Sequence, residues 1–93
     1  MIDQLSDESS KIAQNVEYTL ESFGIKSKVM EVSFKSKHVL IELSIPYGVR
    51  VEEIEDLRKT LALTLASPTG QIEIIAPIPG KPLIGIKLPT KSN

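Results

Sequence analysis

The sequence lacks several of the residues on which catalytic and metal sites are usually built. It has no cysteine and no tryptophan, a single histidine, and four aromatic residues among 93. Without cysteine there is no disulfide framework, no thiolate metal site and no thiol nucleophile. Four aromatic side chains are also too few for the stacking platforms that bind single-stranded RNA. These absences direct attention to binding or assembly rather than catalysis.

Neither sign of charge dominates, and no apolar run is long. Eleven Lys and Arg residues face twelve Asp and Glu residues, for a formal net charge of −1. This excludes a strongly basic nucleic-acid domain but leaves room for a local basic patch.

No apolar stretch approaches the roughly 20 residues that cross a bilayer, and the start of the chain does not have the pattern of a signal peptide. We expect a soluble single domain over residues 1–93.

Two apolar stripes at helical spacing predict helices over residues 9–23 and 51–66. The first stripe consists of Ile12, Val16, Leu20 and Phe23, and the second of Val51, Ile54, Leu57, Leu61 and Leu65. Gly24 is placed to end the first helix in the left-handed conformation. In the second helix, carboxylates occupy the first turns, and Arg58 and Lys59 come later, as the helix dipole prefers.

Alternating patterns predict four strands, over residues 28–34, 38–45, 71–77 and 83–88. The side chains expected to face inward from the first two strands are Met30, Val32, Phe34, Val39, Ile41, Leu43 and Ile45. Pro79 and Gly80 suit the central positions of a type II turn in the second hairpin, because glycine tolerates positive φ. The predicted fold is an α+β two-layer sandwich of order αββαββ. It has two helices on one face of a four-stranded, mainly antiparallel sheet.

No catalytic constellation emerges from these elements. His38 stands beside a predicted turn, where an exposed strand-end histidine is a better interpretation than a general base. The carboxylates at 52, 53, 55 and 56 fan around the second helix rather than converge on a cation. Residues 80–87 imitate a phosphate loop, but Ile86 stands where its lysine is needed and no helix follows. The residues alone therefore favour a non-catalytic binding or assembly module.

Basic side chains are the candidate contacts for a phosphate backbone. Lys35 and Lys37 lie on one predicted hairpin tip, Lys81 lies on the other, and Arg50 precedes the second helix. If both tips shared one edge of the sheet, they would reach the same backbone. Lysines in polar turns also serve solubility alone.

The C-terminal third carries the most specific pattern. Ala-Pro-Ile-Pro-Gly-Lys at 76–81, continued by Ile-Gly-Ile at 84–86 and by Pro89, closely resembles the FtsK/SpoIIIE family of DNA translocases. In that family a similar run leads to Pro-Asn just before the ATPase core. Upstream, Gly-Val-Arg-Val at 48–51 looks like the family's P-G-V-K/R-V, and residues 12–25 look like its opening helix. The resemblance covers residues 10–90.

Several positions depart from the family pattern. This chain has Lys35 and Ser36 where the family has Gly-Pro in the first turn, and Val39 and Leu40 where the family has Thr-Arg. It has Thr60 in place of the family's aspartate, Glu73 in place of its arginine and Thr90 in place of its asparagine. Polar contacts made by those family residues do not carry over to this chain.

The resemblance implies the alpha domain, which stacks as an outer ring on the RecA-like ATPase ring of a hexameric motor. The implied partners are double-stranded DNA in the full motor, the ATPase domain of the same protein, and further copies forming a homo-hexamer. No cofactor is implied for this chain, because ATP and Mg²⁺ belong to the adjoining motor domain. The implied location is cytoplasmic, on the inner side of a membrane where the parent protein is anchored. In isolation we expect a monomer that does not hydrolyse ATP.

For this family we expect Lys81, on its rigid tip, to be the foremost DNA or subunit contact, followed by Lys35, Lys37 and Arg50. We expect Pro79, Gly80 and Pro82 to build the turn, and Gly85 to permit a close backbone approach. The alternative is a free-standing RNA- or protein-binding module, since αββαββ layers recur in unrelated proteins. Gel-shift titration with single-stranded RNA separates the two functions.

Overall fold

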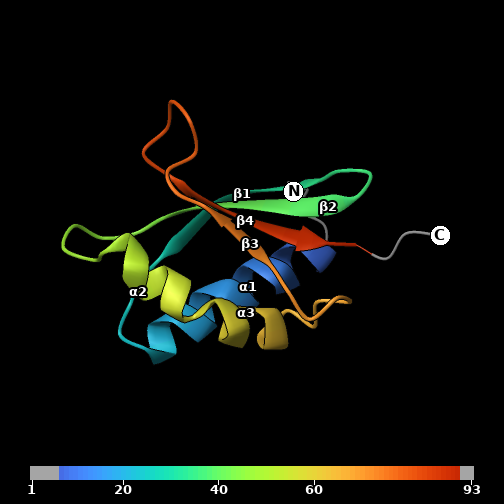
Figure 1. Cartoon of the computed structure of the whole chain (residues 1–93), viewed down its shortest axis with the longest axis horizontal. Helices are drawn as coiled ribbons and strands as arrows, with labels where there is room; N and C mark the ends of the chain where they lie inside the picture. The colour runs from blue at the N-terminus through green and yellow to red at the C-terminus, as the bar shows by residue number, and fades with distance from the viewer. Residues whose placement is uncertain (1–6, 91–93) are drawn as a thin grey trace.

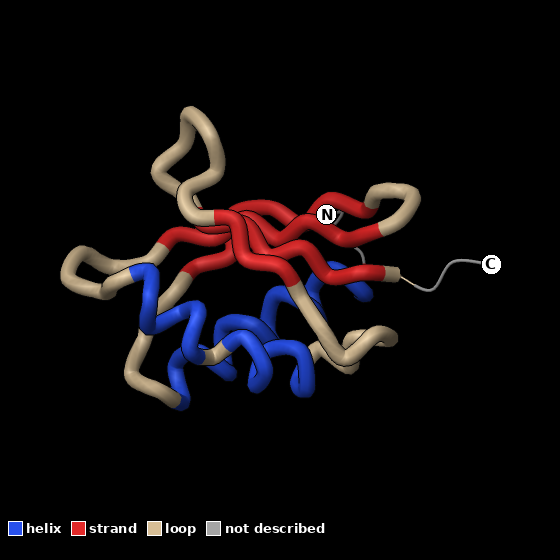
Figure 2. The backbone as a smooth tube through the Cα atoms, in the orientation of Figure 1, coloured by secondary structure: helices blue, strands red, loops and turns tan. Residues whose placement is uncertain are grey.

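The structure, a computed structural model, describes residues 7–90. Its helices are α1 (Asp7–Ser22), α2 (Val51–Asp56) and α3 (Arg58–Thr64), and its strands are β1 (Lys28–Phe34), β2 (His38–Ser44), β3 (Glu73–Ile75) and β4 (Ile84–Pro89). The strands form one antiparallel sheet of order β1-β2-β4-β3. All three helices lie on the same face of this sheet (Figure 1 and Figure 2). The predicted α+β class, element order and two layers are confirmed.

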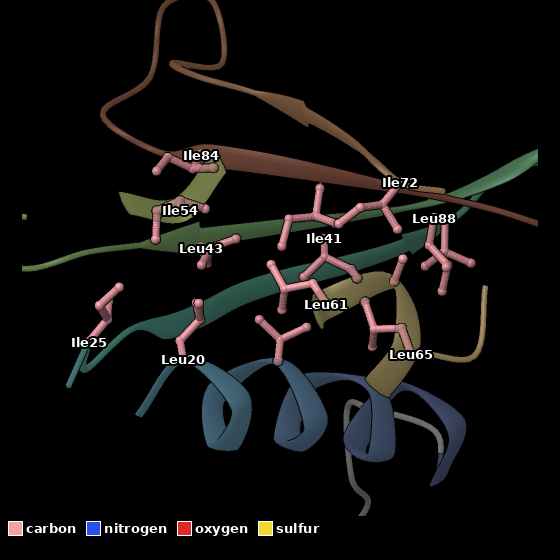
Figure 3. Packing of buried hydrophobic residues seen from close by; sticks show 14 residues of the cluster. Leu20, Ile25, Ile41, Leu43, Ile54, Leu61, Leu65, Ile72, Ile84 and Leu88 are labelled. Atoms are coloured by element: carbon pink, nitrogen blue, oxygen red, sulfur yellow. The ribbon is translucent and has the colours of Figure 1, made fainter. Parts of the chain in front are cut away.

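The core fills the space between the helices and the sheet. Its fully buried side chains are Val16, Leu20, Ile41, Leu43, Ile54, Leu61 and Ile86. Figure 3 shows Leu20, Ile41 and Leu61 pointing into this shared layer from α1, the sheet and α3. Alternate residues of a strand face the same side, so β2 directs Val39, Ile41 and Leu43 inward as predicted. Strand β2, one of the two inner strands of the sheet, thus supplies much of the core.

Strand β1 does not have the predicted inward face. A bulge between Val29 and Glu31 shifts the register, so that Val29 lies opposite Leu43 and Val32 opposite Ile41. Val29 and Val32 pack against the core, whereas Met30 is 55% exposed and Phe34 48%. The prediction that Met30 and Phe34 are buried was wrong. For Met30 the reason is the bulge, which adds one residue and changes the phase of the alternation. Phe34 is in phase with Val32 and pairs with the inward-facing Val39, but it is the last residue of an edge strand.

The predicted helix over residues 51–66 is broken at Leu57, so residues 7–90 contain three helices where two were predicted. Leu57 has ψ of 11°, and its N–H donates to the carbonyl of Ile54, three residues back, at 3.0 Å. The apolar residues at 51, 54 and 57 repeat every three positions, which fits a tighter turn than the α-helix. From Leu57 to Leu65 the repeat is four, and the N–H of Leu61 donates to the carbonyl of Leu57 at 2.8 Å. The break thus keeps the apolar side chains of both α2 and α3 against the core.

Helices α1 and α3 end in the same way. Beyond α1, the N–H of Ile25 donates to the carbonyl of Leu20 at 2.9 Å, and Gly24 between them has φ of +84°. Beyond α3, the N–H of Ser67 donates to the carbonyl of Ala62 at 3.0 Å, and Ala66 has φ of +53°. Both ends are Schellman motifs with a left-handed residue. The turn after α1 buries Ile25 and leaves Phe23 exposed, so including Phe23 in the buried stripe was wrong.

These two ends make a matched pair of predictions. Gly24→Ala should lower the free energy of unfolding by about 1 kcal/mol, because a Cβ is unfavourable at positive φ. Ala66→Gly should raise it by up to about 1 kcal/mol, because alanine already bears that strain. Urea unfolding of both variants measures the two changes. Shifts of the same sign in both would contradict this explanation of the helix ends.

The two predicted strands of the second hairpin differ in their bounds from those observed. Strand β3 covers only Glu73–Ile75, against the expected 71–77. The carbonyl of Gln71 accepts a hydrogen bond from the Ser67 hydroxyl at 2.6 Å, and so belongs to the loop after α3. At the other end Pro77 has no N–H to donate, which ends the pairing. Strand β4 has its expected length of six residues, shifted by one position, and pairs with both β2 and β3.

Candidate nucleic-acid interface

The β3–β4 loop stands on the face of the sheet that the helices leave open, at the top of Figure 1. Within it, the N–H of Lys81 donates to the carbonyl of Ile78 at 2.9 Å, and Gly80 has φ of +79°. The N–H of Ile78 donates to the carbonyl of Leu83 at 2.8 Å. Pro79 and Gly80 therefore occupy the centre of a hydrogen-bonded turn, in the geometry that a type II turn requires.

Gly85 lies beneath this loop, in β4. A Cβ at position 85 would come within 3.2–3.3 Å of the side chains of Ile78 and Leu40. That separation is closer than ordinary packing allows, so a larger residue would push Ile78 away from the sheet. Glycine at this position lets the loop rest directly on the open face.

Lys81 is held to the same face by an ion pair. Its Nζ lies 3.2 Å from Oε1 of Glu42 in β2, and the Glu42 side chain is only 9% exposed. The Lys81 side chain is 50% exposed. Lys81 thus neutralises a buried carboxylate while part of its side chain stays in solvent. Sequence reasoning placed Lys81 on a free tip and did not foresee this partner.

The two hairpin tips do not lie at the same end of the sheet. His38 pairs with Pro89 and Leu43 with Ile84, so the turn at 35–37 lies where β4 ends. The loop carrying Lys81 lies where β4 begins, at the opposite end in Figure 1. The arrangement in which both tips reach one phosphate backbone is therefore not formed within this domain.

Two other predicted groups have identifiable surroundings. Arg50 precedes α2, with its Nε 3.8 Å from Oε2 of Glu53, and its side chain is 76% exposed. His38, at the start of β2, is half-buried beside a hollow of about 320 Å³ that Lys87 and Glu73 also line.

Across residues 7–90, no three His, Asp or Glu side chains gather closely enough to hold a metal ion. No helix in the same range is long and apolar enough to cross a membrane.

Sequence reasoning missed two cations that the fold places beside a hollow. Arg58 and Lys59 line a hollow of about 480 Å³ between α3 and the loop that leads to β3. The sequence pattern explains both as cations late in one long helix, where the helix dipole favours them. That interpretation was wrong, because the break at Leu57 places Arg58 and Lys59 in the first turn of α3. The opposite wall comes from residues 70–72, and only tertiary structure brings those residues to α3.

The fold and these surfaces define a class of small α+β domain, with helices on one face of an antiparallel sheet and a proline-framed loop on the other. The profile of the FtsK alpha domain matches residues 2–90. The chain is 44% identical over 79 residues to the DNA translocase FtsK of Caldanaerobacter subterraneus subsp. tengcongensis, covering 85% of this chain and 11% of the relative. It is 43% identical over 77 residues to the DNA translocase SpoIIIE of Bacillus subtilis, covering 83% and 10%.

The chain belongs to the FtsK alpha domain family. The resemblance seen in the sequence is thereby confirmed. The chain spans about a tenth of the length of the curated relatives that it matches.

Proposed function

We propose that this chain is a non-catalytic accessory domain of a hexameric, ATP-driven translocase of double-stranded DNA. In this role it forms an outer ring layer around the duplex. The observation that carries the proposal is the match over residues 2–90 to one small segment of proteins named DNA translocases. Because that segment is a tenth of each relative, ATP and Mg²⁺ are assigned to the remaining, much larger part.

The proposed partners follow from this role. They are duplex DNA within the assembled motor, the RecA-like ATPase domain of the same protein, and further copies of the chain. The domain works in the cytoplasm, in the segregation or transfer of chromosomal or plasmid DNA. The rigid loop on the open sheet face supports an assembly role, because its turn hydrogen bonds and the Lys81–Glu42 pair hold it in one conformation.

A domain exchange tests the proposal. In the Bacillus subtilis SpoIIIE protein, this chain replaces the segment that matches it, and DNA translocation and ATP hydrolysis are measured. We expect the exchanged protein to translocate at a rate comparable to its parent, whereas deletion of the segment removes most translocation. An unrelated two-layer domain of similar length in the same place is the control.

The proposal fails if the exchanged protein translocates as poorly as the deletion while its hexamer still assembles and hydrolyses ATP. Membership of the family favours this function over a free-standing RNA- or protein-binding module. Sequence-dependent binding of single-stranded RNA in a gel shift would reverse that preference.

A further inference from the structure

The hollow between α3 and the following loop has an apolar floor and a polar rim. Ala62 and Ile72 are nearly fully buried and form the floor, whereas Arg58, Lys59 and Gln71 are exposed at the rim. Figure 1 shows the loop running from the end of α3 to β3. The lining residues of the hollow come from α3 and from this loop. Its volume of about 480 Å³ falls within the range of about 300–1,000 Å³ of small-ligand sites.

The donors at this rim have no partner within residues 7–90. Arg58 and Lys59 form no ion pair there, and the side-chain amide of Gln71 forms no hydrogen bond. Glu55 precedes the two cations by three and four residues, yet it is not paired with either. Two cations and an amide therefore surround one hollow with their hydrogen-bonding capacity unused.

Two other hollows with cations differ in this respect. Lys87 lines one of them together with Glu73, and their charged atoms lie 3.8 Å apart. Lys11 lines another together with Glu8. The hollow at Arg58 has no carboxylate in its lining. Its positive charge is thus the least compensated of the three, which favours an anionic ligand.

We propose that this hollow binds a phosphate group of the duplex DNA backbone, an inference that rests on the proposed function. The guanidinium of Arg58 presents a fork of donors that suits two phosphate oxygens. Lys59 adds a point charge, and Gln71 adds an amide donor. Side chains of these kinds make a large share of the protein–DNA hydrogen bonds to phosphates, and such contacts carry no sequence information. The binding is therefore independent of DNA sequence.

A titration of the ¹⁵N-labelled chain with a short blunt-ended duplex, followed by NMR, tests the proposal. We expect the amide signals of Ala62, Gly70 and Gln71 to shift. The variant Arg58→Gln/Lys59→Gln should weaken binding by about tenfold or more at about 50 mM salt, and by less at about 200 mM. Because one phosphate is no longer neutralised, the slope of log affinity against log salt should fall by about 1. Lys26→Gln/Lys28→Gln removes the same charge from an exposed segment elsewhere and should have a much smaller effect. Glu55→Gln should strengthen binding.

Three results would overturn the proposal. In the first, the two double variants weaken binding equally, which would show an effect of net charge alone. In the second, no signal around the hollow shifts with duplex. In the third, the chain self-associates through the hollow and Arg58→Gln/Lys59→Gln abolishes this, which would assign it to carboxylates of a second copy. Unchanged spectra elsewhere in each variant show that folding is intact.

The failure of this inference is distinguishable from failure of the proposed function. If Arg58→Gln/Lys59→Gln in the exchanged SpoIIIE protein leaves translocation and its salt dependence unchanged, the DNA contact is refuted and the accessory function stands. If the exchanged protein with native residues fails, the accessory function is refuted. The titration then still reports on the hollow itself.

Discussion

Ile41→Ala is expected to destabilise the domain by about 2–5 kcal/mol, the range for removing a large aliphatic side chain from a packed core. Ile41 is fully buried. It lies in β2 between Val32 of β1 and Ile86 of β4, and faces the helix layer. Neighbours on both sides belong to paired strands, so they collapse little into the cavity. A domain of this size has only about 5–15 kcal/mol to lose.

Urea unfolding measures this loss against a matched control. Leu63→Ala removes a similar side chain, but Leu63 is 78% exposed and its loss should change stability by less than about 0.5 kcal/mol. The dependence on urea should keep the same slope in both variants. Equal destabilisation by Ile41→Ala and Leu63→Ala would show that the core is not where the structure places it.

Lys81→Met should destabilise the domain by about 1–3 kcal/mol, because it leaves the buried Glu42 carboxylate without its partner. The cost stays below the roughly 3–5 kcal/mol of a fully buried pair, because water reaches the half-exposed Lys81 position. Methionine keeps most of the aliphatic length, so the change isolates the charge. Lys87→Met is the control, since Lys87 pairs at 3.8 Å with a Glu73 side chain that is 67% exposed. Its cost should be under about 1 kcal/mol.

A double-mutant cycle identifies the cause of the Lys81 effect. Glu42→Gln removes the buried charge, so adding Lys81→Met to it should cost much less than Lys81→Met alone, with a coupling of about 1 kcal/mol. Additive losses would mean that Lys81 contributes through packing rather than through Glu42. The result also bears on DNA binding. If a Lys81 variant stays folded and its affinity for DNA depends less steeply on salt, the change points to a contact of Lys81 with DNA.

Much of the fold was predictable because its signals are local. The alternation in residues 38–45 predicts β2 and its buried face, and Gly24 marks the end of α1 where its φ is positive. The predictions that failed depend on non-local geometry. Met30 is exposed because β1 carries a bulge opposite β2, and the break at Leu57 lets α2 and α3 both pack on one core.

The sequence by itself determined the element order, the two-layer class and the turn at Pro79 and Gly80, because the signals for each element lie within a few positions of one another. It also indicated the family, chiefly through the run from Ala76 to Pro89. Only the tertiary structure decided what the charged groups do. Lys81 meets Glu42 across 39 positions of sequence, and Arg58 and Gln71 border one hollow from separate segments. The two lysine-bearing tips lie at opposite ends because β4 runs antiparallel to β2. Spacing along the chain carries no information about such pairings, since the folding of the sheet against the helices creates them.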